Sequence, residues 1–168
     1  LMSPQQQPVA QGQIEPGKKA VIDTPVPADG IYNLILTTGG NVAQLLLGNE
    51  HAVILGSRLT LLGPSGPMYF YVPTSAKGFQ VKLDSPGPGE TAKITILDPE
   101  GREAASAQTG PQKEVTLKVS VPAAERGKGW CVVPGKGPMG VWEDYGVTLG
   151  AELPPYWSLA PDRLLVPA

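Results

Sequence analysis

The sequence is poor in the residues on which many protein chemistries depend. It has one cysteine and one histidine among 168 residues, and only two phenylalanines, three tryptophans and five tyrosines. The lone Cys131 excludes an internal disulfide and any multi-cysteine metal site. The net charge is −2, and no basic cluster indicates nucleic-acid binding. No apolar run reaches the roughly 18 residues of a membrane helix, and no signal peptide is evident, so we expect no membrane insertion.

Histidine- and carboxylate-based hydrolysis both lack the necessary residues. A Ser–His–Asp arrangement would need His51 as its base, but there is no G-x-S-x-G elbow, and we expect His51 on the surface or in a loop. Glu143 and Asp144 are adjacent, so on a strand they would point to opposite faces and could not act together on a sugar. We therefore predict a protein that is not an enzyme.

Metal and cofactor sites are not indicated either. Asp98, Glu100 and Glu103 crowd one turn, but they lack the D-x-D-x-D-G-like spacing of calcium loops. Cys131 follows Trp130 in an apolar run, which predicts a buried structural thiol rather than a reactive one. We expect no metal and no cofactor.

What the chain has in quantity is glycine and proline, 21 and 19 residues, falling between short apolar runs. This pattern is typical of turns in an all-β protein. Ten to twelve short strands are expected, which predicts an antiparallel β-sandwich or jelly roll. Residues 1–17 read as a linker or extended N-terminal arm and 18–168 as the sandwich domain, with a Pro-rich tail at 153–168 strapped along a sheet edge. The weak likeness of Val26-Pro27-Ala28 to Val121-Pro122-Ala123 leaves open two related halves, 18–65 and 66–150.

The clearest predicted unit is a hairpin over residues 91–121. Its first arm alternates apolar and polar residues and ends at a turn in which Asp98 caps the backbone, Pro99 presets φ and Gly101 takes a positive φ. A polar loop then leads to a long second arm at 115–121. Further strands are expected at 19–24, 31–37, 43–47, 51–55, 58–62, 68–72, 79–83, 129–133 and 140–149.

Four sequence pieces in residues 67–134 follow one another in the order of a known module. They are Tyr69-Phe70-Tyr71-Val72-Pro73, Lys77-Gly78-Phe79-Gln80-Val81-Lys82-Leu83, Ile94-Thr95-Ile96-Leu97-Asp98-Pro99-Glu100-Gly101, and Val121-Pro122-Ala123 with 130–133. This stretch resembles the bacterial pre-peptidase C-terminal domain, a jelly-roll β-sandwich appended to secreted enzymes. The resemblance implies an accessory, non-catalytic module. Where relatives commonly carry an acidic residue this chain has Gly66-Pro67-Met68, so a calcium site is not carried over.

The aromatic residues near the C-terminal end suggest a ligand site. Aromatic rings beside carboxylates can grip sugars by stacking and hydrogen bonding. The candidate ligand-binding residues are Trp142, Asp144, Tyr145, Tyr156 and Trp157. The competing interpretation, which we favour, is that Pro154-Pro155-Tyr156-Trp157 packs the tail onto the sheet and covers Trp142.

The sequence thus predicts an accessory β-sandwich module of a larger secreted or cell-envelope bacterial protein. It would act as a spacer or a binding module, with polysaccharide or a fused catalytic domain as the expected partner. The alternative is a freestanding structural or adhesive protein that associates through sheet edges.

Overall fold

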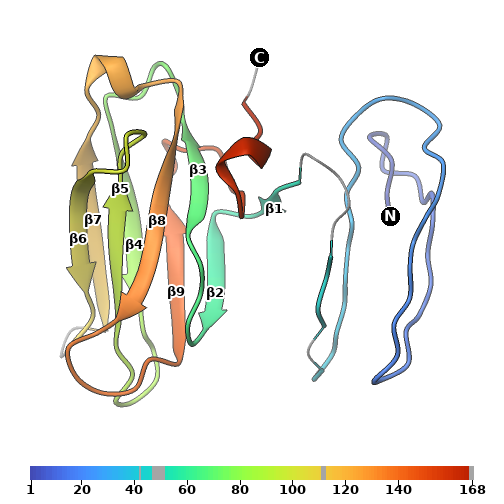
Figure 1. Ribbon diagram of the computed structural model, residues 1–168, viewed down its shortest axis with the longest axis horizontal. Helices are drawn as coiled ribbons and strands as arrows, with labels where there is room; N and C mark the ends of the chain where they lie inside the picture. The colour runs from blue at the N-terminus through green and yellow to red at the C-terminus, as the bar shows by residue number, and fades with distance from the viewer. Residues whose placement is uncertain (42, 47–51, 111–112, 167–168) are drawn as a thin grey trace. The chain divides into compact units, whose positions relative to one another are not determined.

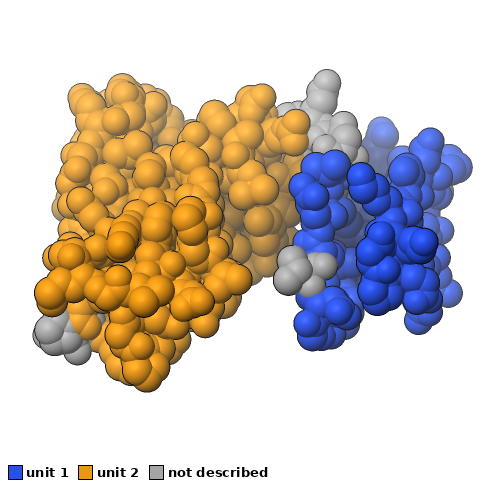
Figure 2. Space-filling model, turned by 60° about the horizontal axis from the view of Figure 1, so that its bottom comes forward, with its two compact units in different colours: residues 1–46 blue, residues 47–168 orange. Residues whose placement is uncertain are grey.

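A computed structural model describes residues 1–168 except 42, 47–51, 111–112 and 167–168. The chain divides into two compact units, Leu1–Leu46 and Leu47–Ala168 (Figure 2). All ten strands of the described residues lie in the second unit. The structure is 39% strand and 4% helix, which confirms the predicted all-β class.

The first unit holds no regular strand or helix among its described residues. Over residues 1–41 and 43–46, its strand-like pairing consists of two isolated bridges, from Met2 to Pro8 and to Asn33. The strands predicted at 19–24 and 31–37 were therefore wrong, as was the strand expected at 43–47 over its described part. An alternating pattern makes a strand only when a neighbour supplies the ladder of hydrogen bonds. Without that neighbour, the apolar side chains stay exposed: Val21, Ile22, Ile31, Leu34, Ile35, Leu36, Leu45 and Leu46.

The second unit is a sandwich of two four-stranded antiparallel sheets (Figure 1). The first sheet has the order β2-β9-β4-β7, with bounds Arg58–Leu62, Asp144–Leu149, Gly78–Asp84 and Glu114–Ser120. The second has the order β3-β8-β5-β6, with bounds Met68–Val72, Lys128–Lys136, Ala92–Leu97 and Glu103–Gln108. Two 3₁₀ turns, η1 and η2, cover Ala123–Glu125 and Pro161–Arg163.

A small third sheet joins the start of the sandwich to its end. β1 (Ile54–Leu55) pairs antiparallel with β10 (Tyr156–Trp157). The next residue along, Ser158, forms a bridge to Tyr69 on β3, with backbone hydrogen bonds of 2.8 Å in both directions. The tail therefore lies along the edge of the second sheet, which confirms the predicted strap.

The core lies between the two sheets and follows the alternation of the sequence. On β4 the buried residues are Phe79, Val81 and Leu83, and on β5 they are Ala92, Ile94 and Ile96. Aromatic rings link the two layers edge to face: Phe79 lies 5.3 Å from Phe70 and 5.2 Å from Trp130, centroid to centroid. Burying one such side chain contributes roughly 1.5–3 kcal/mol, so this interior accounts for most of the driving force for folding.

The hairpin predicted over 91–121 is replaced by a different connection. β5 pairs with β6, a strand of small and polar residues for which the sequence predicts a loop. The long second arm, β7, instead pairs with β4 in the other sheet. The chain therefore crosses between the sheets after β6. Similarly, the strand predicted at 140–149 begins only at Asp144, because Gly140 has a φ of 80° and Val141 bridges to Glu90.

Over the described residues, no helix is long and apolar enough to cross a membrane.

Candidate functional site

The two aromatic residues of the tail are used to anchor it. Trp157 is 0% exposed, and its ring packs edge to face on Phe70 with centroids 5.9 Å apart. Tyr156 is half-buried and donates a hydrogen bond from its hydroxyl to the carbonyl of Leu165 at 2.6 Å. Beyond η2, Leu164 lies over Gly129 of β8, where an added Cβ would come within 2.9 Å of its Cδ2. These contacts match the anchoring interpretation of the tail.

The other three candidates belong to β9 and the residues before it. Tyr145 is 1% exposed and donates from its hydroxyl to the Gly63 carbonyl at 3.2 Å; burial raises the pKa of this phenol. Trp142 is half-buried against the core, its ring centroid 6.2 Å from that of Tyr145. Asp144 is exposed at the start of β9, opposite Leu62. Trp142 thus packs on Tyr145, rather than standing free on the outer face.

The five candidates do not form one surface. Tyr145 pairs with Leu61 near the end of β2, whereas β10 pairs with β1, which precedes the start of β2. The five residues of β2 span about 17 Å at the usual rise per residue. A stacking platform also needs exposed ring faces, and the two most buried candidates, Tyr145 and Trp157, offer none.

The turn after β5 has the predicted geometry. The Asp98 carbonyl accepts from the Gly101 N–H at 2.9 Å, and Gly101 has a φ of 79°. The Asp98 Oδ1 accepts from the backbone N–H of Glu100 and of Arg102, both at 2.9 Å. Burial raises the pKa of Asp98, but these hydrogen bonds and the Arg102 guanidinium outweigh it and leave the pKa lowered. Pro99 occupies the position that presets the turn.

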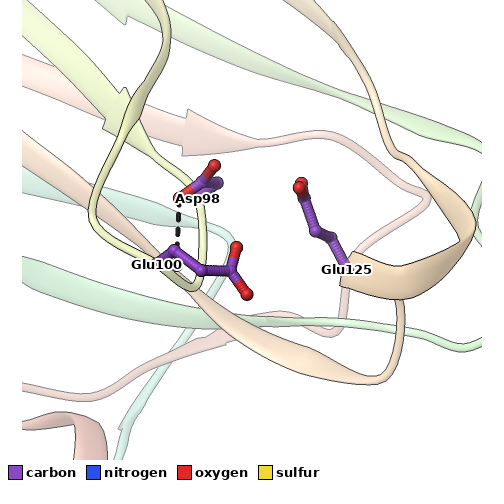
Figure 3. Close-up of side chains that lie close together, drawn as sticks. All are labelled: Asp98, Glu100 and Glu125. Carbon is purple, nitrogen blue, oxygen red and sulfur yellow. Dashed lines mark hydrogen bonds between the residues drawn. The ribbon is translucent and has the colours of Figure 1, made fainter.

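Three carboxylates gather where this turn meets η1. Asp98, Glu100 and Glu125 offer oxygen atoms that lie within 4.8 Å of one another (Figure 3). Arg102 contacts all three carboxylates, at 2.6 Å, 3.0 Å and 2.9 Å respectively. Lys128 adds a contact to Glu100 at 3.5 Å. The cluster is thus already partnered by two cations and joins the β5–β6 turn to η1.

Other acidic side chains of the sandwich also have partners. Glu103 accepts from the Ser106 hydroxyl at 2.7 Å. Asp84 pairs with Arg58, and Glu90 accepts from the Gly87 N–H at 2.9 Å.

Cys131 and His51 are the one cysteine and the one histidine of the sequence. Cys131 is buried on β8, as predicted, and burial raises the pKa of its thiol to about 11. That pKa keeps the thiol protonated near neutral pH, so it is a poor nucleophile. His51 lies outside the described residues.

The sequence did not reveal an ion-pair ladder on the outer face of the first sheet. Arg58 on β2 reaches across β9 and pairs with Asp84 on β4 through both guanidinium nitrogens, one of them at 2.8 Å. Lys82, also on β4, reaches toward the neighbouring strand on the side away from β9. It contacts Glu114 on β7 at 2.8 Å. No pattern in the sequence could have found these pairs, because the partners come from strands far apart along the chain.

No protein-family model matches this chain, and no curated protein is significantly similar to it.

Proposed function

We propose that this protein is a non-catalytic accessory module of a larger secreted or cell-envelope bacterial protein, and that it acts by binding a neighbouring domain. The accessory role and the compartment follow the resemblance to pre-peptidase C-terminal domains. Of the two roles expected from the sequence, spacer and binding module, the fold favours binding.

The observation that carries this preference is the pairing of β1 with β10. Ile54 lies opposite Trp157, so the first and the last strand of the sandwich lie side by side. A module attached in this way protrudes from the chain and adds little to the distance between its neighbours. An in-line spacer would instead have its entry and exit at opposite ends of the sheets.

A protein partner fits the surface better than a polysaccharide does. Tyr145 and Trp157 are buried, so two of the four predicted sugar-stacking rings are not available. The outer face of the first sheet instead presents the ion pairs of Arg58 with Asp84 and of Lys82 with Glu114. Charged faces of this kind suit partner recognition, in which complementary charges set specificity.

A glycan array and a hydrolysis assay with the full chain test this proposal. We expect no retained glycan and no new reducing ends from soluble polysaccharides. Retention of one glycan class that Trp142→Ala abolishes would replace the protein partner by a polysaccharide. Release of reducing ends would contradict the non-catalytic role.

A second candidate function is self-association through a sheet edge. It is favoured by β2, which ends the first sheet and carries the exposed Leu62, with 68% of its surface accessible. Exposed apolar edges of this kind readily pair with another strand.

A further inference from the structure

β2 presents an open hydrogen-bonding edge over the described residues. The Ser57 carbonyl accepts a hydrogen bond from β9 at 2.8 Å, and the Gly63 N–H donates to the residue that precedes β9 at 2.9 Å. Antiparallel pairs alternate, so Leu59 and Leu61 also bond to β9. Thr60, between them, directs its N–H and C=O away from the sheet.

The core is also incomplete beside this edge. Ile54 lies opposite Trp157, and residues directly opposite share a face of their sheet, so Ile54 points toward the core side. It is nevertheless 40% exposed. The bridge from Ser158 to Tyr69 extends the second sheet by β10 and β1, whereas the first sheet stops at β2. One more strand beside β2 would cover Ile54 and the open flank of Leu61.

The usual protection of an edge is weak at β2. Natural edges are blunted by charged side chains that repel an incoming strand. The one charge on β2 is Arg58, and Asp84 draws it back over its own sheet. The remaining residues that face outward, Thr60 and Leu62, are uncharged.

Residues 31–37 have the properties of the missing strand. They carry no charge, and Tyr32, Leu34 and Leu36 alternate on one face. The Asn33 N–H and C=O both bond to Met2, at 3.0 Å and 2.8 Å. No described residue forms a backbone hydrogen bond with Leu34 or Leu36. In an extended strand, both would direct their backbone groups to the side away from Met2.

We propose that the 31–37 segment of one copy adds as a fifth strand to the β2 edge of a second copy. Each chain carries both the strand and the edge, so the proposed dimer is the one in which two copies exchange their segments reciprocally. Tyr32, Leu34 and Leu36 then face inward, over Ile54 and Leu61. This inference rests on the second candidate function and names the surfaces that carry it.

Light scattering of the full chain over a wide range of concentration tests the proposal with two pairs of variants. Thr60→Pro removes the outward N–H of β2 without breaking a bond to β9, and Thr60→Val keeps that N–H. Leu34→Lys places a charge on the inward face of the segment, and Ile35→Lys places the same charge on its outward face. We expect Thr60→Pro and Leu34→Lys to weaken dimerisation at least about tenfold and to give the mass of one chain. The control variants Thr60→Val and Ile35→Lys should keep the mass of a dimer.

The outcomes separate the inference from the function on which it rests. A dimer that survives both Thr60→Pro and Leu34→Lys overturns strand addition but leaves self-association through another surface. A wild-type chain that stays monomeric overturns both strand addition between copies and self-association. This holds even if hydrogen exchange shows that the amides of 31–37 are protected in the monomer. If circular dichroism shows that Thr60→Pro is unfolded, the result for Leu34→Lys decides whether strand addition occurs. Leu34 lies outside the sandwich, so this substitution leaves the sandwich folded.

Discussion

The Arg58 guanidinium lies directly over the backbone of Gly146, where a Cβ would collide with its terminal nitrogens. Gly146 sits on β9, between Arg58 on β2 and Asp84 on β4, and it is opposite Asp84 in the register. A strand glycine normally weakens a sheet, because it has no side chain to pack. Here its missing side chain provides the passage through which the ion pair crosses three strands.

Gly146→Ala should therefore break the Arg58–Asp84 pair. The Arg58 side chain is flexible and 41% exposed, so it can move aside, and the cost is the loss of a partly screened pair. We expect a loss of about 1 kcal/mol in the free energy of unfolding, measured with urea. Gly135→Ala on β8 is the matched control, because its Cβ would meet nothing closer than 4.0 Å. In an Arg58→Met background the effect of Gly146→Ala should vanish; an equal loss in both backgrounds would show that the ion pair is not involved.

Stability should fall in acid partly through Asp84. The hydrogen bond from Arg58 lowers the pKa of Asp84 below its ordinary value of 3.8, and this effect outweighs burial, which raises the pKa. A lowered folded-state pKa means that the stabilisation is present above pH 3.8 and is lost as the pH falls through the folded value. Asp84→Asn should make the fall in melting temperature below pH 3.8 shallower. Some slope should remain, because the pKa of Asp98 is lowered as well. If the melting temperature of Asp84→Asn depends on pH as that of the wild type does, the Arg58–Asp84 pair does not contribute to acid sensitivity.

Gly101→Ala tests the turn after β5. An alanine at the φ of 79° found there is strained by about 1–2 kcal/mol. Gly110→Ala is the control, since no described atom lies within 4 Å of a Cβ added at Gly110 and its φ is not positive. We expect a lower melting temperature for Gly101→Ala alone. Equal melting temperatures for the two variants would contradict the turn geometry.

Trp157→Ala tests the anchoring of the tail. Loss of this fully buried indole should lower the free energy of unfolding by about 3 kcal/mol or more. Trp142→Ala, at a half-buried position, should cost less. Urea unfolding measures both, and tryptophan emission of the wild type should not respond to added oligosaccharides. A Trp157→Ala variant of wild-type stability would contradict the packing on Phe70.

The sequence predicted the fold well where burial enforces alternation. β3, β4 and β7 appear close to their predicted positions, because one face of each is covered by the other sheet. The pattern failed in two opposite ways. Residues 31–37 alternate but lack a ladder partner within the described chain, whereas β6 has small and polar residues and forms a strand because β5 pairs with it.

The candidate site was harder to predict than the fold. The turn at Asp98 could be found because its signals are local and lie within four residues. The aromatic set could not be placed, because periodicity does not say which strand covers which ring. Trp142 turned toward Tyr145, and the tail covered Gly129 instead. The Arg58–Asp84 pair depends on β2 and β4 flanking β9, which no local pattern encodes.

The pairing of β1 with β10 also determines how the sandwich responds to tension. Pulling on the chain on both sides of the sandwich first releases the tail contacts of Ser158 and Leu164. It then loads Ile54 and Trp157, which lie opposite each other at the outer end of their two-residue ladder. The force then acts across the ladder, so its hydrogen bonds break one after another. Force along the strands would instead load all of them together in shear. The small sheet should therefore peel open at low force and draw Trp157 out of the core, while the two four-stranded sheets are still folded. The β1–β10 pairing holds the two ends of the sandwich together in the absence of force, and under tension it is the first of the three sheets to separate.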